Sequence, residues 1–295
     1  MHQPVMVAEV LEHLAPERGG VFVDCTVGLG GHASALLEAG ASRLIGLDRD
    51  PAALVEAAEV LRPFGDRVKL IHIDYRRLDE VLSNQGLGVV NGLLADLGVS
   101  SGQLDAPGRG FSFRRDEPLD MRMDTTTGVT AAEAIQEVSE RTLADVIFEF
   151  GEERQSRRIA RAIVSARARA PISTTGQLAE VVRRAVPRRG YTRIDPATRT
   201  FQAIRIWVNR ELEGLDVFLA QATRRLQPGG RMVVISFQSL EDRVVKHTLR
   251  ALQAANELSI RTKRPLVPGE PEIGRNPRAR SAKLRAAERP EPSEM

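Results

Sequence analysis

A regular alternation of short apolar runs and helical patterns extends through the first hundred residues. Four runs have the length and apolar content of buried strands, at residues 21–24, 43–48, 68–72 and 92–96. Segments with helical spacing lie between them, at residues 32–38, 51–61 and 78–82. Strands that alternate with helices form βαβ units, so this part of the chain predicts a mainly parallel sheet.

The alternation stops after residue 103. Residues 104–199 contain almost no strand pattern, and four helical segments are predicted there instead, at residues 131–135, 140–150, 154–168 and 175–185. The sequence therefore predicts an α/β, Rossmann-like sheet domain formed by residues 1–103 and 200–295, with an inserted all-helical domain at residues 104–199.

The last third of the chain returns to the α/β pattern. Helices are predicted at residues 201–213 and 215–226, a turn at residues 227–230 and a strand at residues 231–237. Residues 259–261 and 282–285 are candidates for a final antiparallel pair of strands. These segments would complete the sheet that the first hundred residues begin.

Composition narrows the setting in which the protein works. The chain has 295 residues, 42% of them hydrophobic, and it contains no apolar run of 18 residues or more, so we expect no membrane partner. We expect no signal peptide, because the first residues lack a basic region followed by an apolar stretch. Cys25 is the only cysteine and cannot form an internal disulfide. We therefore expect a cytoplasmic protein.

Positive charge is concentrated in two segments, although the net charge is only +3. Residues 154–210 contain 14 arginines and two acids, and residues 258–289 contain nine basic residues and three acids. Arg154, Arg157, Arg158 and Arg161 share one face of a predicted helix. Such faces suit a polyanion such as RNA, and an ordinary solvated helix surface is an equally good interpretation of the charge alone.

The strongest local motif is a glycine-rich loop that follows the first predicted strand. Asp24 ends that strand, and Gly28, Gly30 and Gly31 come before the next helix. Residues 28–33 match the G-x-G-x-x-A pattern of dinucleotide-binding proteins. An acid four residues before the first glycine is instead typical of enzymes that use S-adenosylmethionine. Asp48, at the end of the second strand, suits the ribose of either cofactor.

Nine strings, spread in order over nearly the whole chain, resemble the RsmH (MraW) family of bacterial small-subunit ribosomal RNA methyltransferases. They are residues 2–5 (HQPV), 28–32 (GLGGH), 47–51 (LDRDP), 96–105 (DLGVSSGQLD), 109–114 (RGFSFR), 118–124 (PLDMRMD), 196–203 (PATRTFQA), 235–243 (ISFQSLEDR) and 276–281 (NPRARS).

The resemblance implies transfer of a methyl group from S-adenosylmethionine to the N4 amine of a cytidine at the decoding site of 16S rRNA. It implies 16S rRNA or the small ribosomal subunit as partner, and it leaves a homodimer open. The cofactor-binding positions of the family fall here on Gly30, Gly31, His32, Asp48, Tyr75, Asp96 and Gln103.

The chain departs from the family pattern at two positions. Tyr75 stands where Phe is common, and a ring that can stack on adenine is kept. Gln238 stands where His is common, and Gln cannot act as a base near neutral pH.

The sequence assigns no catalytic residue and predicts no metal site. Asp96 has a position suited either to the adenine amine or to the methyl-transfer site. Methylation at a ring carbon of cytosine needs a cysteine nucleophile, and Cys25 lies in the first strand–loop segment, the wrong place for it. The rival functions are a methyltransferase acting on amines of DNA or other RNAs, a nicotinamide-dependent dehydrogenase, and a non-catalytic RNA-binding ribosome-assembly factor.

Overall fold

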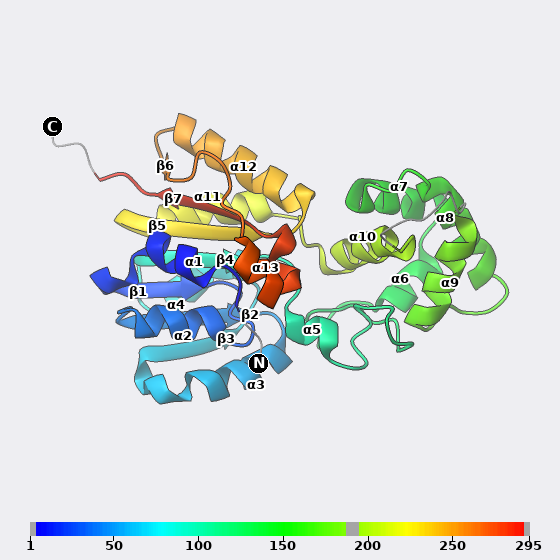
Figure 1. Cartoon of the computed structure of the whole chain (residues 1–295), viewed down its shortest axis with the longest axis horizontal. Helices are drawn as coiled ribbons and strands as arrows, with labels where there is room; N and C mark the ends of the chain where they lie inside the picture. The colour runs from blue at the N-terminus through cyan, green and yellow to red at the C-terminus, as the bar shows by residue number, and fades with distance from the viewer. Residues whose placement is uncertain (1–3, 187–194, 292–295) are drawn as a thin grey trace. The chain divides into compact units, whose positions relative to one another are not determined.

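The computed structural model of the chain describes residues 4–186 and 195–291, apart from the side chain of Ser101 (Figure 1). It consists of two compact units, one formed by Met1–Ser100 with Leu212–Met295 and the other by Ser101–Glu211. His2 and Gln3 of the first family string, and Arg188, Arg189 and Arg193 of the basic segment, lie outside the described residues.

The first unit is built on a seven-stranded sheet with the strand order β3-β2-β1-β4-β5-β7-β6. The strands are β1 (Val21–Asp24), β2 (Arg43–Asp48), β3 (Val68–His72), β4 (Val90–Asp96), β5 (Leu226–Ser236), β6 (Ser259–Ile260) and β7 (Lys283–Glu288). Strands β1 to β5 are parallel, and β7 is antiparallel to both β5 and β6. The predicted α/β fold class and the final antiparallel pair are confirmed.

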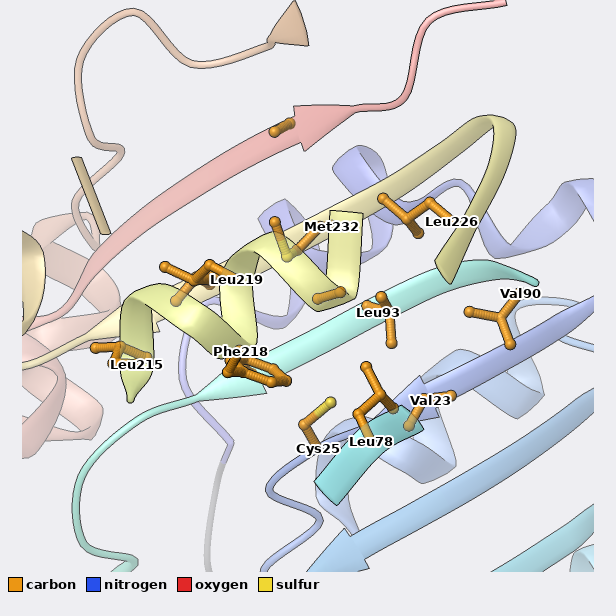
Figure 2. Close-up of a cluster of buried hydrophobic side chains, with 14 of the residues drawn as sticks. Val23, Cys25, Leu78, Val90, Leu93, Leu215, Phe218, Leu219, Leu226 and Met232 are labelled. Atoms are coloured by element: carbon orange, nitrogen blue, oxygen red, sulfur yellow. The ribbon is translucent and has the colours of Figure 1, made fainter. Parts of the chain in front are cut away.

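Helices cover both faces of this sheet. They are α1 (Val7–Leu14), α2 (Gly31–Glu38), α3 (Pro51–Leu61), α4 (Leu78–Asn84), α11 (Leu215–Arg225), α12 (Ser239–Ala254) and α13 (Glu270–Arg275), with short 3-10 turns at Pro16–Arg18, Arg62–Arg67, Tyr75–Arg77 and Pro277–Ser281. The core between the sheet and helices α4, α11 and α12 is apolar (Figure 2). A second core packs α1, α2 and α3 on the other face.

The turn predicted at residues 227–230 is wrong. These residues belong to β5, which begins at Leu226. The pairing with β4 shifts between Val90, opposite Leu226, and Gly92, opposite Arg231. Gly229 has a φ of 71°, so the Pro-Gly-Gly sequence forms an irregularity inside a strand rather than a turn before it. Helices α1, α12 and α13 were not predicted.

The second unit is helical in its regular structure. Its helices are α5 (Ser101–Asp105), α6 (Ala131–Glu137), α7 (Glu140–Gly151), α8 (Ser156–Arg167), α9 (Thr175–Ala185) and α10 (Ala197–Asn209). Helix α7 packs against α8 and α10, and α8 packs against α9. The predicted boundary at 199/200 falls within α10, which belongs to the helical unit, so that this unit extends to Glu211.

The expected basic face of α8 needs a correction at its start. Arg154 precedes the helix, which begins at Ser156, whereas Arg157, Arg158 and Arg161 are exposed on it. Ile159 and Ile163 are buried, as expected for the inward face, and Ala160 is buried in addition. Ala162 and Ala166 are only partly buried. The helix is amphipathic with a shorter arginine face than the sequence predicts.

Candidate active site

Four neighbouring strands end at one edge of the sheet, and each is followed or ended by a carboxylate. Asp48 ends β2, Asp24 ends β1 and Asp96 ends β4. Glu241 lies in the first turn of α12, directly after β5. Because these parallel strands are neighbours in the order β2-β1-β4-β5, their carboxyl ends place the four acids along one edge. We call these four residues the carboxylate cluster.

Asp24 is buried and only partly satisfied. Its Oδ1 accepts a hydrogen bond from the backbone N–H of Thr26 at 3.1 Å, and its Oδ2 is inaccessible to water and has no hydrogen-bond partner among the described residues. Burial raises the pKa of Asp24 to about 7, and the charge of Asp48 adds to the increase. A carboxylate in this state gains most from a positively charged ligand.

Asp96 has the same character. Its backbone N–H donates to Thr26 Oγ1 at 2.7 Å, which fixes the end of β4 beside the loop after β1. Its Oδ1 is inaccessible to water and unpartnered within the described chain. Burial raises the pKa of Asp96 well above the usual range, and Asp24 and Glu241 increase it further. Asp96 therefore offers a hydrogen-bonding atom that the described part of the protein leaves unused.

The glycine loop lies against Asp48. The backbone N–H of Gly28 donates to Asp48 Oδ2 at 2.9 Å, and that of Asp50 donates to Oδ1 at 2.8 Å. Gly28 and Gly30 have φ angles of 51° and 85°, in the left-handed region that favours glycine. Both Asp48 oxygens keep a second lone pair that can accept from a ligand hydroxyl. The loop and the acid therefore form one unit, as expected for a ribose-binding position.

Gly31 is required by a close approach of the N-terminal segment. A Cβ at Gly31 would lie 2.9 Å from Pro4 Cγ, closer than real side chains pack. Val5, the next residue, accepts a hydrogen bond from His32 Nε2 at 2.8 Å. A carbonyl can only accept, so Nε2 carries a proton. The segment at residues 4–5 thus fixes both the start of α2 and the orientation of the His32 ring.

His32 therefore uses one ring nitrogen inside the protein. Its other nitrogen, Nδ1, lies 3.9 Å from Asp96 Oδ2, beyond hydrogen-bond distance but close enough for an ion pair if the ring is protonated. The backbone of His32 is in the first turn of α2, where helix N–H groups suit a carboxylate.

Tyr75 and Gln103 occupy different surroundings. Tyr75 follows β3, and its ring packs on Phe218 with 4.5 Å between the ring centroids. Burial raises the pKa of Tyr75, so its hydroxyl stays protonated. Gln103 lies on α5 in the helical unit. Its place in a cofactor site remains a prediction from the resemblance.

Glu241 is the member of the cluster that sequence reasoning missed, although it stands in one of the family strings. It accepts from the backbone N–H of Phe237 at 3.0 Å and of Gln238 at 3.2 Å. With Gln238 as the N-cap, Glu241 forms a capping box at the start of α12. An acid four residues after the end of a predicted strand is the signal that could have found it. Gln238 thus has a structural role in the cap.

The cluster distinguishes between the two cofactors that the glycine loop allows. A pyrophosphate is anionic and would meet uncompensated carboxylates at this edge. S-adenosylmethionine carries an ammonium and a sulfonium, which the unpartnered oxygens of Asp24 and Asp96 can stabilise. The residues present therefore fit a cationic cofactor better than a dinucleotide.

Comparison with known proteins decides the family. Residues 1–290 match the MraW methylase family. The chain belongs to the MraW methylase family. This MraW-family chain is 49% identical to Ribosomal RNA small subunit methyltransferase H of Bradyrhizobium diazoefficiens, over 98% of the chain and 91% of the relative. Proteins of the same name from Sorangium cellulosum and Geotalea uraniireducens are 50% and 47% identical, each over 98% of this chain and over 90% and 98% of the relative.

Membership of the MraW methylase family identifies the chemistry of the site as methyl transfer. The nicotinamide-dependent dehydrogenase considered from the G-x-G-x-x-A match is therefore set aside. None of the helices in residues 4–186 and 195–291 is long and apolar enough to cross a lipid bilayer.

Proposed function

We propose that this protein transfers the methyl group of S-adenosylmethionine to the N4 amine of a cytidine at the decoding site of 16S rRNA. The observation that supports S-adenosylmethionine as the cofactor is the pair of buried, unpartnered carboxylate oxygens on Asp24 and Asp96, where the strands end. The substrate class rests on the relatives, which are named for methylation of small-subunit ribosomal RNA. The cytidine N4 position rests on the family resemblance of the motifs.

Each cofactor-binding residue has a distinct part in this proposal. Asp24 pairs with the ammonium of the cofactor, and Asp48 accepts from the ribose hydroxyls. The backbone of Gly30, Gly31 and His32 approaches the amino acid carboxylate at the start of α2. Tyr75, held by Phe218, lies beside the adenine. Gln103 is assigned to the cofactor by the family resemblance alone.

S-adenosylmethionine supplies, when bound, a methyl group on a sulfonium that needs little further activation. The chain has to align and polarise the amine that attacks it. Asp96 Oδ1 accepts a hydrogen bond from the N4 amine, which localises the nitrogen lone pair and stabilises the positive charge that develops there. Asp96 would also receive the proton that the methylated amine releases, provided that the positive charge of the bound cofactor keeps its carboxyl ionised before the transfer.

The exposed face of α8 contributes binding of the RNA backbone in this proposal. Charge reversal at Arg157 and Arg158 should weaken binding of an rRNA fragment. If each arginine contacts one phosphate, the plot of the log association constant against log salt concentration should become less steep, its slope decreasing in magnitude by about 1.4. Filter binding at four salt concentrations measures both quantities. Arg18→Glu with Lys69→Glu, at exposed positions of the sheet unit, is the matched control. An unchanged slope in the α8 variant would exclude this face.

The decisive experiment uses small ribosomal subunits from a strain that lacks this protein. Incubation with labelled S-adenosylmethionine should label one cytidine, and mass spectrometry of the nucleosides should identify it as N4-methylcytidine. Label in DNA or in another RNA would move the proposal to the rival amine methyltransferase. RNA binding without any label, with cofactor binding intact, would favour a non-catalytic assembly factor.

A further inference from the structure

Helix α12 lies beside β6 and β7 at the edge of the sheet (Figure 1). Basic side chains line a groove between these elements. The space along it is about 240 Å³, a figure that includes open solvent. Its lining consists of Lys246, Leu249 and Arg250 from α12, Ile260 from β6, Thr262 and Lys263 after β6, and Arg285 from β7. We call this the α12–β7 groove. It is formed by residues other than those of the carboxylate cluster.

The charge of the groove is poorly compensated. Of its four cations, Arg285 is paired, because its Nε donates to Asp242 Oδ1 at 2.8 Å. Lys246, Arg250 and Lys263 form no ion pair or hydrogen bond with the described residues. Lys246 and Arg250 are one helical turn apart on α12, where like charges repel each other. Three uncompensated cations around one groove favour an anionic ligand.

The groove also offers a neutral donor. Thr262 is 5% exposed, and its Oγ1 accepts from the backbone N–H of Ala286 at 3.0 Å. The hydroxyl proton has no acceptor among the described residues, so it can be donated to a ligand. Hydroxyl, ammonium and guanidinium donors are the groups that proteins use to bind phosphate oxygens of nucleic acids.

The position of the groove relates it to the carboxylate cluster through α12. Glu241 is in the first turn of this helix, and Lys246 and Arg250 follow it on the same element. At the rise of an α-helix, these two cations lie roughly 8 and 14 Å farther along the axis than Glu241. The groove and the carboxylate cluster therefore belong to the same unit and share α12.

We propose that the α12–β7 groove binds the phosphodiester backbone of the RNA next to the nucleotide that enters the active site. The identity of the ligand as RNA rests on the proposed function, and the anion-binding character rests on the groove alone. The groove is partly open to solvent, and Ile260, which is only partly buried, offers apolar contact for a sugar. A free phosphate has the same chemistry and is the alternative source to be tested.

The first test neutralises the groove in the full-length protein. The triple variant carries Lys246→Gln, Arg250→Gln and Lys263→Gln. It should bind a fluorescent rRNA fragment about tenfold more weakly at 0.1 M salt, and the slope of log affinity against log salt concentration should decrease in magnitude by about 2. The kcat at saturating RNA and the affinity for S-adenosylmethionine should stay unchanged. The control variant is Arg18→Gln, Arg62→Gln and Lys69→Gln, three exposed cations elsewhere in the sheet unit. An equal loss in both variants, or none in the groove variant, overturns the proposal.

A second test uses the wild-type protein and does not depend on the folding of a variant. The chain has only four lysines, Lys69, Lys246, Lys263 and Lys283. The rRNA fragment should protect Lys246 and Lys263 from acetylation and leave Lys69 reactive. Acetylation of Lys246 and Lys263 at the same rate with and without RNA contradicts the proposal.

Two further outcomes separate the possible failures. If inorganic phosphate protects Lys246 and Lys263 from acetylation and the rRNA fragment does not, the groove is a free-phosphate site and the RNA assignment is overturned. If the wild type methylates no ribosomal RNA but binds it through the groove, the proposed function fails and the groove stands. If methylation is normal with an unchanged KM for RNA in the groove variant, the groove fails and the function stands.

Discussion

Helix α12 connects two regions of opposite charge. At its start, Glu241 belongs to a cluster of buried carboxylates, whereas Lys246 and Arg250 farther along line an exposed basic groove. In both regions the described residues leave polar groups unpartnered, namely one oxygen each of Asp24 and Asp96 in the cluster and three cations in the groove. The difference is burial. It raises the pKa of Asp24 and Asp96 in the cluster, whereas Arg250 and Lys263 of the groove are exposed.

Burial determines what each region can bind. A buried carboxylate pays a large desolvation penalty, so it binds one cation at a defined position and responds to pH. An exposed ammonium keeps its hydration until a ligand arrives, so it attracts a polyanion at long range and responds to salt. We therefore expect cofactor binding to depend on pH and RNA binding to depend on the salt concentration.

The largest effect is expected for Asp96→Asn. The amide keeps the shape of the carboxyl and one oxygen that can accept from the N4 amine, but it loses the negative charge that stabilises the developing positive charge and the ability to take up the N4 proton. We expect kcat to fall by about 10²- to 10³-fold. Single-turnover methylation at saturating cofactor and RNA measures this step. Cofactor affinity, measured by calorimetry, should change less than turnover. Turnover at the wild-type rate would remove Asp96 from the reaction.

The next effect concerns Asp24, where binding and stability should change in opposite directions. Asp24→Asn removes the partner of the ammonium and should weaken cofactor binding about 10- to 100-fold. In the cofactor-free protein the same change removes a buried charge. Because the folded pKa is about 7 and the ordinary value is 3.8, the wild type loses stability as the pH rises between these values.

The variant should therefore unfold with a free energy about 2–4 kcal/mol higher than the wild type at pH 8. This gain should shrink as the pH falls from about 7 towards 4, where the folded wild-type carboxyl holds its proton and the unfolded one is still ionised. Urea titrations at four pH values test the sign. A gain in unfolding free energy that is independent of pH, or a loss at pH 8, would show that the buried carboxylate of Asp24 does not destabilise the folded protein.

More of the carboxylate cluster than of the groove could be predicted from the sequence. Asp24, Asp48 and Asp96 could be placed at strand ends because local apolar runs define those strands, and the structure confirms the positions. Glu241 could not be placed, because its closeness to them depends on β5 lying beside β4, a contact between distant segments. The cofactor roles of these residues, and of Gly30, Gly31, His32, Tyr75 and Gln103, remain predictions.

The groove is less visible in the sequence for the same physical reason. Its lining comes from three segments, residues 246–250, 260–263 and 285, which are 10 and 22 residues apart in the sequence. No local sequence pattern indicates that they lie together. The sequence shows the charge of residues 258–289 but not that α12 supplies Lys246 and Arg250 opposite it. The turn predicted at residues 227–230 was wrong for a different reason. Pro and Gly are typical of turns, but here they lie inside strand β5.

The smallest expected effect tests the one compensated cation of the groove. Asp242 accepts from Arg285 Nε at 2.8 Å and from Lys283 Nζ at 3.4 Å. Burial acts to raise the pKa of Asp242, but hydrogen bonding and charge from Arg285 and Lys283 lower it overall, so the carboxylate is ionised near neutral pH. Asp242→Asn removes one negative charge next to the groove and keeps an oxygen that can accept from Arg285.

Affinity for the rRNA fragment should then rise about two- to threefold at 0.05 M salt, and the gain should vanish at 0.5 M, where charges are screened within a few ångströms. The protein should lose about 1 kcal/mol of stability, because a partly buried ion pair becomes a neutral hydrogen bond. Asp242→Glu, which keeps the charge, is the matched control. An Asp242→Asn variant that binds RNA more weakly would show that Asp242 positions the groove rather than balancing its charge. The salt dependence of the groove would then need a geometric explanation, and its contrast with the carboxylate cluster would rest on shape rather than on charge.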